Sequence, residues 1–105
     1  MTGDDLAELL AALANPVRMR IVARLAGGRQ YVSQLAREIG VSRPLLHMHL
    51  QKLEAAGLVA GSLELSTDGK AMKYFEVTDF DIRLTAATLA EAAESLTTPA
   101  RKEQP

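Results

Sequence analysis

Two histidines, His47 and His49, are the residues in this chain best suited to metal chemistry. They lie in the stretch VSRPLLHMHLQKLEAAGLV, residues 41–59. On a helix, residues two apart project about 200° from each other, so these side chains cannot bind one ion together. The chain has no cysteine, which excludes thiolate metal sites, disulfides and a cysteine nucleophile. The spacing therefore predicts two separate histidines rather than a metal pair.

The element that must position these histidines is a helix with a leucine stripe. Leu46, Leu50 and Leu53 recur at helical spacing, Ser42 suits the N-cap, and Pro44 is tolerated in the first turn. Gly57 ends this helix. A shorter helix precedes it, from about Ser33 to Ile39, and Gly40 closes that helix. A short helix, a tight turn and a longer helix form the helix-turn-helix arrangement.

Two further helices are expected before this pair and three elements after it. The first helix begins near Asp4 and ends at Asn15-Pro16, and the second runs from about Pro16 to Ala26 before Gly27-Gly28. After Gly57, the runs LVAGSLEL and AMKYFEV flank Asp68-Gly69, a strong hairpin signal. Thr78 and Asp81 suggest a capping box for a final helix. The fold class is therefore mainly α with a small β-hairpin (α+β): four helices, two strands and a fifth helix.

The final helix carries an apolar stripe that repeats at steps of four and three residues. The stripe is heptad-like and rich in alanine, so another helix could approach it closely. The first helix is rich in leucine. One interpretation is that both helices pack on their own domain; the other, which we favour, is that they pair with a second copy. The predicted dimer interface consists of Leu6, Leu9, Leu10, Leu13, Ile82, Ala86, Leu89, Ala93 and Leu96.

Length and composition indicate a single soluble domain. The chain has 105 residues, of which 48% are hydrophobic and 24% charged. We expect a domain over residues 1–97 and a disordered tail over residues 98–105. The N-terminus is acidic and unlike a signal peptide, and no apolar run approaches the roughly 20 residues of a membrane helix. These features predict a cytoplasmic protein without a membrane partner.

Charge is distributed unevenly along the chain. Residues 16–60 carry seven Arg or Lys against two Glu, a net charge of +5, although the whole chain has a formal net charge of −1. A basic middle between acidic ends is expected if only the middle meets a polyanion. The alternative is that these arginines lie on solvated helix faces.

Three stretches resemble one family of regulators. LANPVRMRIVARLAGG is similar to the opening of the ArsR/SmtB repressors, in which L-x-x-P-x-R leads a helix that ends in glycines. SQLAREIGVSRPLLHMHLQKLEAAGLV resembles the family's helix-turn-helix, including the ending H-L-x-x-L-x-x-A-G-L-V, part of which MarR regulators share. DGKAMKYFEVTD falls where the family has its wing. The match covers about Leu13 to Asp79 and implies a winged helix-turn-helix that dimerises through its terminal helices.

The resemblance implies binding to double-stranded DNA, and the residues support it. An α-helix fits the major groove, where its N-terminal, outward-facing side chains reach base edges. Arg43 could pair with guanine, and Gln51 could pair with adenine or hold a phosphate. Ser33 and Ser42 can donate to phosphates, whereas the lysines beside the hairpin tip either follow the DNA or simply solubilise an exposed edge. The predicted DNA-binding residues are Ser33, Ser42, Arg43, Pro44, His47, Met48, Gln51, Lys70 and Lys73.

His49 matches the histidine of the family's ending. We expect it at the edge of its helix, near the backbone or a neighbouring helix.

The family's metal sensors carry cysteines before the recognition helix, or Asp and His on the last helix. Here the corresponding stretches, VSQLAREIG and DFDIRLTAATLAEAAESL, lack cysteine and histidine respectively. Asp79, Asp81, Glu91 and Glu94 would leave only a weak oxygen site for a transition metal. We therefore predict no metal site and no cofactor. Direct metal sensing, a small organic effector, and a sensor protein partner that carries nickel or zinc are the alternatives left open.

An enzymatic function is not expected. The sequence has no Gly-rich phosphate loop, no cofactor signature, and no serine–histidine–acid set that this fold would bring together. The competing hypothesis is a protein-interaction module that uses the groove-facing surface or the alanine-rich helix for a protein partner. The sequence thus favours a homodimeric repressor that binds an inverted-repeat operator.

Overall fold

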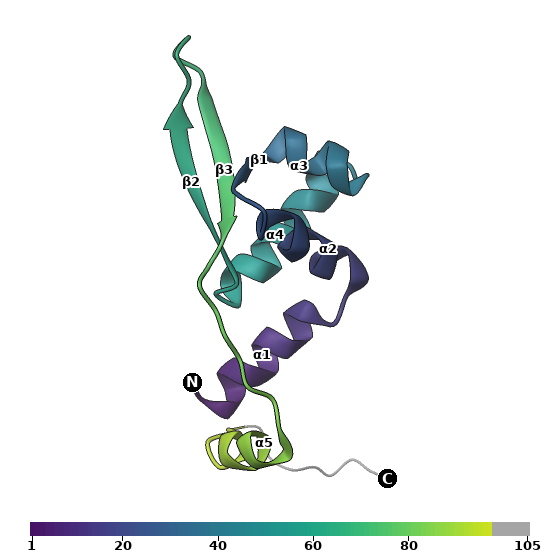
Figure 1. Ribbon diagram of the computed structural model, residues 1–105, viewed down its shortest axis with the longest axis vertical. Helices are drawn as coiled ribbons and strands as arrows, with labels where there is room; N and C mark the ends of the chain where they lie inside the picture. Colours follow the sequence, from purple (N-terminus) through teal and green to yellow (C-terminus); the bar gives the residue numbers. More distant parts are fainter. Residues whose placement is uncertain (98–105) are drawn as a thin grey trace.

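The computed structural model describes residues 1–97, which form five helices and a three-stranded sheet. The hairpin of β2 and β3 extends from one end of the molecule, and α1 and α5 lie at the other end (Figure 1). The elements are α1 (Gly3–Leu13), α2 (Pro16–Leu25), β1 (Gln30–Tyr31), α3 (Val32–Ile39), α4 (Arg43–Ala55), β2 (Val59–Leu65), β3 (Ala71–Val77) and α5 (Ala86–Ala93).

Side-chain caps fix where the helices begin. The Thr2 side chain accepts a hydrogen bond from the Asp5 N–H, and the Thr2 N–H donates to the Asp5 carboxylate, so α1 begins one residue before the predicted Asp4. The Asn15 side chain accepts from the N–H groups of Val17 and Arg18, at 2.9 and 3.1 Å. Ser42 accepts from the Leu45 N–H at the start of α4. The predicted caps Asn15 and Ser42 are therefore confirmed.

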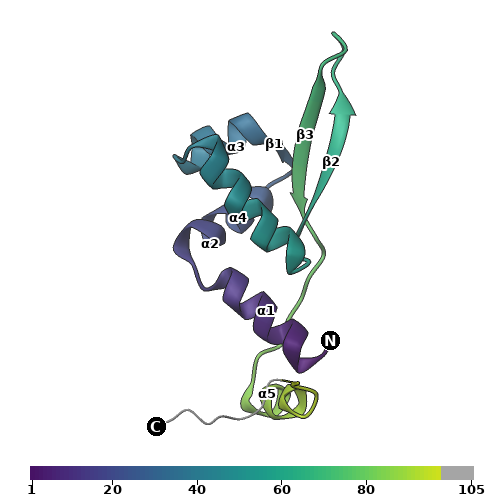
Figure 2. The same cartoon turned by 180° about the vertical axis from the view of Figure 1, so that it is seen from behind.

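The helix-turn-helix is packed by the predicted leucine stripe. Leu46, Leu50 and Leu53 of α4 are fully buried, together with Leu35 of α3 and Leu25 of α2. Gly40 ends α3 with a φ of 85°, a left-handed conformation that costs glycine little. The tight turn at Gly40 lets α4 cross over α3 beside the hairpin (Figure 2).

The sheet contains a strand that the sequence did not predict. β1 is two residues long and pairs with β3 antiparallel, with Gln30 opposite Phe75, so the strand order is β1-β3-β2. A two-residue strand is too short for an alternating pattern to indicate it. The hairpin itself is confirmed: Leu65 pairs with Ala71, and Gly69 has a φ of 85° in the turn.

The predicted start of the last helix is wrong. Thr78 does not cap a helix: its hydroxyl donates to the carbonyl of Gly57 at 2.8 Å, and its N–H donates to the carbonyl of Leu58 at 3.0 Å. These bonds tie the end of β3 to the start of β2. Phe80 and Ile82, two residues apart, then pack against the core, so the chain continues without a helix to Thr85.

Helix α5 is consequently shorter than expected. Thr85 and Thr88 form its capping box, in place of Thr78 and Asp81. Ile82 lies before the helix and Leu96 lies after it, so the apolar stripe is only partly helical. Among residues 1–97, no helix is both long and apolar enough to cross a membrane. The tail predicted over 98–105 lies outside the described residues.

Helix α5 packs on α1 at a close approach. A Cβ at Gly3 would lie 2.2 Å from the Ala92 carbonyl oxygen, so only glycine fits there. The Gly3 N–H donates to Ser95 Oγ at 2.7 Å, and Thr97 Oγ1 donates to Asp4 Oδ2 at 2.6 Å. These contacts hold the start of α1 against the end of α5.

Candidate nucleic-acid interface

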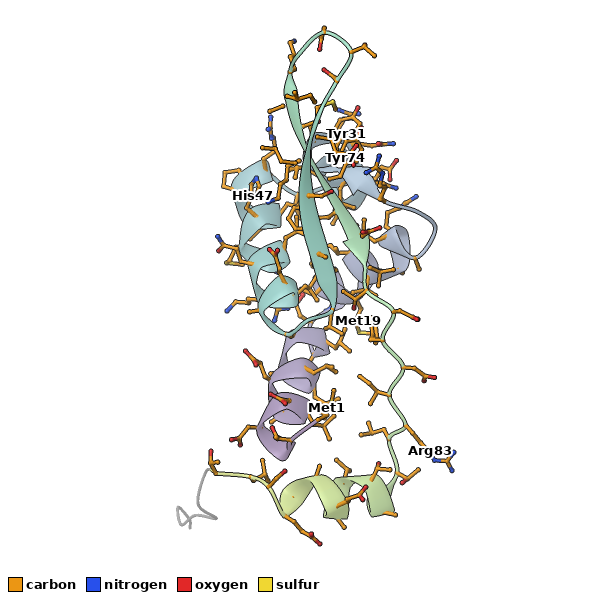
Figure 3. The ribbon with its side chains drawn as sticks, turned by 90° about the vertical axis from the view of Figure 1, so that its left-hand side faces the viewer. Met1, Met19, Tyr31, His47, Tyr74 and Arg83 are labelled. Carbon is orange, nitrogen blue, oxygen red and sulfur yellow. The ribbon has the colours of Figure 1, made fainter. Side chains whose placement is uncertain are left out.

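A groove of about 250 Å³ lies between the hairpin and the N-terminal ends of α3 and α4. Ser33 of α3, Arg43 and His47 of α4, and Lys73 of β3 line it. His47 lies on the side of α4 nearest the hairpin (Figure 3). The fold therefore brings together four of the predicted DNA-binding residues from three different elements.

The remaining predicted residues of α4 are exposed beside this groove. Because the leucine stripe faces the core, Pro44, Met48 and Gln51 lie at the surface, and Ser42 is exposed just before the helix. Helix α3 has no side-chain hydrogen bond at its N-cap, Tyr31. The amide end of a helix favours anions, so Ser33 lies where a phosphate oxygen would be stabilised.

The two wing lysines lie in different places: Lys70 in the tip turn and Lys73 at the groove. Lys70 lies in the tip turn, where its N–H donates to the side chains of Ser66 and Asp68. Lys73 lies opposite Leu63 in the ladder and reaches the groove beside α4. Sequence reasoning placed both lysines at the tip, because it could not follow the direction of the Lys73 side chain.

Arg29 is an anchor of the wing that sequence reasoning missed. Its guanidinium forms a bidentate ion pair with Glu64 of β2, including an Nη2–Oε1 contact of 3.0 Å, and lies 4.3 Å from the centroid of the Tyr74 ring. This hydrogen bonding lowers the pKa of Glu64. The Tyr31 ring meets the Tyr74 ring edge-on at 5.9 Å. The contact joins residues 35 apart, and no local pattern signals it.

His49 contacts a neighbouring helix, as predicted, but it is buried rather than at the edge of α4. Arg18 Nη1 of α2 donates to His49 Nδ1 at 3.1 Å, because a guanidinium carries donors and no acceptor, so the imidazole accepts through an unprotonated nitrogen. Arg18 Nε donates to the Ala12 carbonyl at the end of α1, at 2.6 Å. One side chain therefore connects α1, α2 and α4. Burial, Arg18 and Lys52 all lower the pKa of His49 from its ordinary value of 6.5.

The lowered pKa of His49 makes folding sensitive to acid. The unfolded chain binds a proton at this position at higher pH than the folded protein does, so the contribution to stability is complete above pH 6.5 and is lost as the pH falls through the folded pKa. We expect the free energy of unfolding to decrease as the pH falls below about 6.5, and His49→Gln to make this decrease less steep. Urea unfolding across this range measures it. A His49→Gln variant with the slope of the parent would contradict the assignment.

An apolar groove of about 310 Å³ lies between α1 and α5. Leu89 and Leu96 are each 44% exposed there, and Leu10 and Ala93 also line it. Leu6 also lines the groove but is only 7% exposed, Leu9 is buried within its own chain, and Leu10, Leu13 and Ile82 pack on the core. Of the predicted interface, Leu6 and Leu9 therefore have least surface left for a second copy. Ala86, the first residue of α5, is exposed.

Within residues 1–97, no three His, Asp or Glu side chains gather closely enough to hold an ion. Asp79, Asp81, Glu91 and Glu94, the carboxylates considered above, form no such group.

Comparison with known proteins identifies the family. A family model described as a helix-turn-helix domain matches residues 13–61. An uncharacterised helix-turn-helix transcriptional regulator of Methanocaldococcus jannaschii is 34% identical over 76 residues, which cover 72% of this chain and 79% of the relative. The transcriptional repressor SmtB of Mycobacterium tuberculosis is 45% identical over 58 residues, which cover 55% of this chain and 43% of SmtB.

Solved structures of similar fold are also transcriptional regulators. The homodimeric winged helix-turn-helix DNA-binding domain of a possible ArsR-family regulator from Mycobacterium bovis has a TM-score of 0.62 at 30% identity, covering 70% of this chain and 64% of that one. The repressor BigR from Xylella fastidiosa has a TM-score of 0.61 at 26% identity, covering 96% of this chain and 91% of that one. The chain belongs to the ArsR/SmtB-like family of winged helix-turn-helix transcriptional regulators.

Proposed function

We propose that this protein is a repressor that binds an inverted-repeat operator as a homodimer. The observation that carries the proposal is the groove in which Arg43, His47 and Lys73 meet, because it joins the start of a recognition helix to a wing. Such a helix places its N-terminal side chains against base edges in the major groove, while cations beside it neutralise phosphates.

The homodimer is supported by the exposed apolar groove between α1 and α5. Apolar surface of this kind, with Leu89 and Leu96 each 44% exposed, is stabilised when a second copy covers it. The Mycobacterium bovis domain is a homodimer in solution, and SmtB is a repressor. Two recognition helices in a symmetric dimer would contact half-sites about one DNA turn apart.

A gel-shift titration tests the proposal. The probe is the DNA directly upstream of the gene that encodes this chain, with a scrambled fragment of equal length as control. We expect a shifted band at dimer stoichiometry whose affinity falls steeply with salt. A dimeric sample that gives no salt-sensitive, sequence-dependent shift would favour the protein-interaction module instead. Thermal unfolding with and without nickel or zinc tests direct metal binding.

Lys70 provides a prediction for the wing tip. Because it is exposed in the turn and does not line the groove beside α4, we expect it to contact phosphates rather than bases. Lys70→Ala should weaken binding to the operator and to the scrambled DNA alike, and lower the salt slope by about one unit. Titration of both DNAs over a salt series measures this. A loss confined to the operator would show that Lys70 reads sequence.

A further inference from the structure

We propose that Gly61 is a positioning residue for Lys73, and that it allows this lysine to face the recognition helix. The inference rests on the proposed DNA binding, since it assigns how one cation of the groove is held. Gly61 lies on β2 and Lys73 on β3. The two are not paired in the ladder, so neither the pairing nor the residue types indicate that Lys73 lies across Gly61.

The Lys73 side chain occupies the space that a side chain at position 61 would need. A Cβ built on Gly61 would lie 2.8 Å from Lys73 Cε and 2.9 Å from Phe75 Cε1, closer than real Cβ atoms approach. Gly61 is paired with Phe75, and Leu63 is paired with Lys73. Because alternate residues share a face of a sheet, Gly61, Lys73 and Phe75 lie on the same side of the hairpin. Lys73 therefore runs back from the tip across Gly61.

Phe75 holds the lysine in this direction. Its ring is 4% exposed and belongs to the core, so it is a fixed support. Lys73 Nζ lies 5.5 Å from the ring centroid, within the range of a cation–π contact. The aliphatic part of the lysine covers the glycine while its ammonium stays at the groove.

The consequence is a preorganised cation opposite Arg43. Lys73 and Arg43 line the same groove from β3 and α4, so a phosphate between the wing and the helix would meet charge from both sides. A lysine that is already oriented loses less conformational entropy when DNA binds. A side chain at position 61 would turn Lys73 away without removing its charge.

A double-mutant cycle tests this role. We compare the parent, Gly61→Ala, Lys73→Met and the double variant for binding to the operator fragment across a salt series. Lys73→Met should weaken binding about 3–10-fold and lower the salt slope by about one unit. Gly61→Ala should give a similar loss in the parent and a much smaller loss in the Lys73→Met background, where only the close approach to the Phe75 ring remains. Gly27→Ala is the matched control, because a Cβ there meets only the Arg24 carbonyl at an ordinary 3.5 Å.

A second measurement separates this role from packing and from DNA binding itself. In the free protein, the ring current of Phe75 should shift the NMR signals of the Lys73 Hε protons, and Gly61→Ala should return them toward ordinary lysine values. An equal loss of DNA affinity from Gly61→Ala in both backgrounds, or unshifted Hε signals in the parent, would overturn the inference. If the signals shift as expected but the parent binds no operator, only the proposed function fails.

Discussion

Leu89→Glu is expected to convert the protein to a monomer and to weaken operator binding by about 10²–10⁴-fold. Leu89 is 44% exposed in the apolar groove between α1 and α5. A carboxylate there would be buried without a partner when a second copy covers the groove, which is strongly unfavourable. A monomer contacts one half-site and loses the effective concentration that links two recognition helices. Sedimentation and a gel shift measure the two effects.

The control for this change is Met19→Glu. Met19 is 58% exposed on α2 and does not line the groove, so the same charge change should leave the dimer intact. Because Leu89 is exposed and α5 has no buried residue, Leu89→Glu should keep the fold of the chain, as circular dichroism can verify. A Leu89→Glu sample that sediments as a dimer would mean that the copies associate through another surface.

Arg43→Ala is expected to lose most of the preference for the operator over scrambled DNA. Arg43 is the first residue of α4 and is exposed at the groove, where its guanidinium can reach a guanine edge. A good bidentate contact to a base contributes about 1–3 kcal/mol of discrimination. We therefore expect operator affinity to fall roughly 10–100-fold, with a smaller loss on scrambled DNA. Paired titrations of the two fragments give the ratio directly.

Arg20→Ala removes the same charge from a different face. Arg20 is exposed on α2 and lines a depression with Arg24 and Glu38, away from the wing groove. The Arg20→Ala variant should keep the parent's preference for the operator over scrambled DNA. Equal operator affinity in Arg43→Ala and the parent would place the recognition surface elsewhere on the chain.

Rules based on short stretches of sequence predicted the structure correctly where the interacting residues are close in sequence. The caps at Asn15 and Ser42, the turn at Gly40 and the hairpin at Asp68-Gly69 each depend on a few consecutive residues, and all four are present. The leucine stripe of α4 set which face is buried, so the outward position of His47 followed from periodicity. The burial of His49 did not, because it was expected at the edge of the helix.

The same local rules failed for the last helix. Thr78 and Asp81 have the residue types of a capping box, but the Thr78 hydroxyl donates to backbone carbonyls just before β2. In addition, Phe80 and Ile82 pack against the core. The true capping box at Thr85 and Thr88 uses two threonines. Tertiary contacts therefore decided between two sites that could each begin a helix.

The sequence by itself determined the order of the helices, the hairpin and the exposed face of α4, because these follow from backbone propensity and from the period of apolar residues. Only the tertiary structure decided which distant side chains meet: Arg29 with Glu64, Arg18 with His49, and Lys73 across Gly61. Each of these contacts joins residues on different elements. The spacing of His47 and His49 showed that they point apart. Only the fold showed where each one lies: His47 in the wing groove and His49 against Arg18.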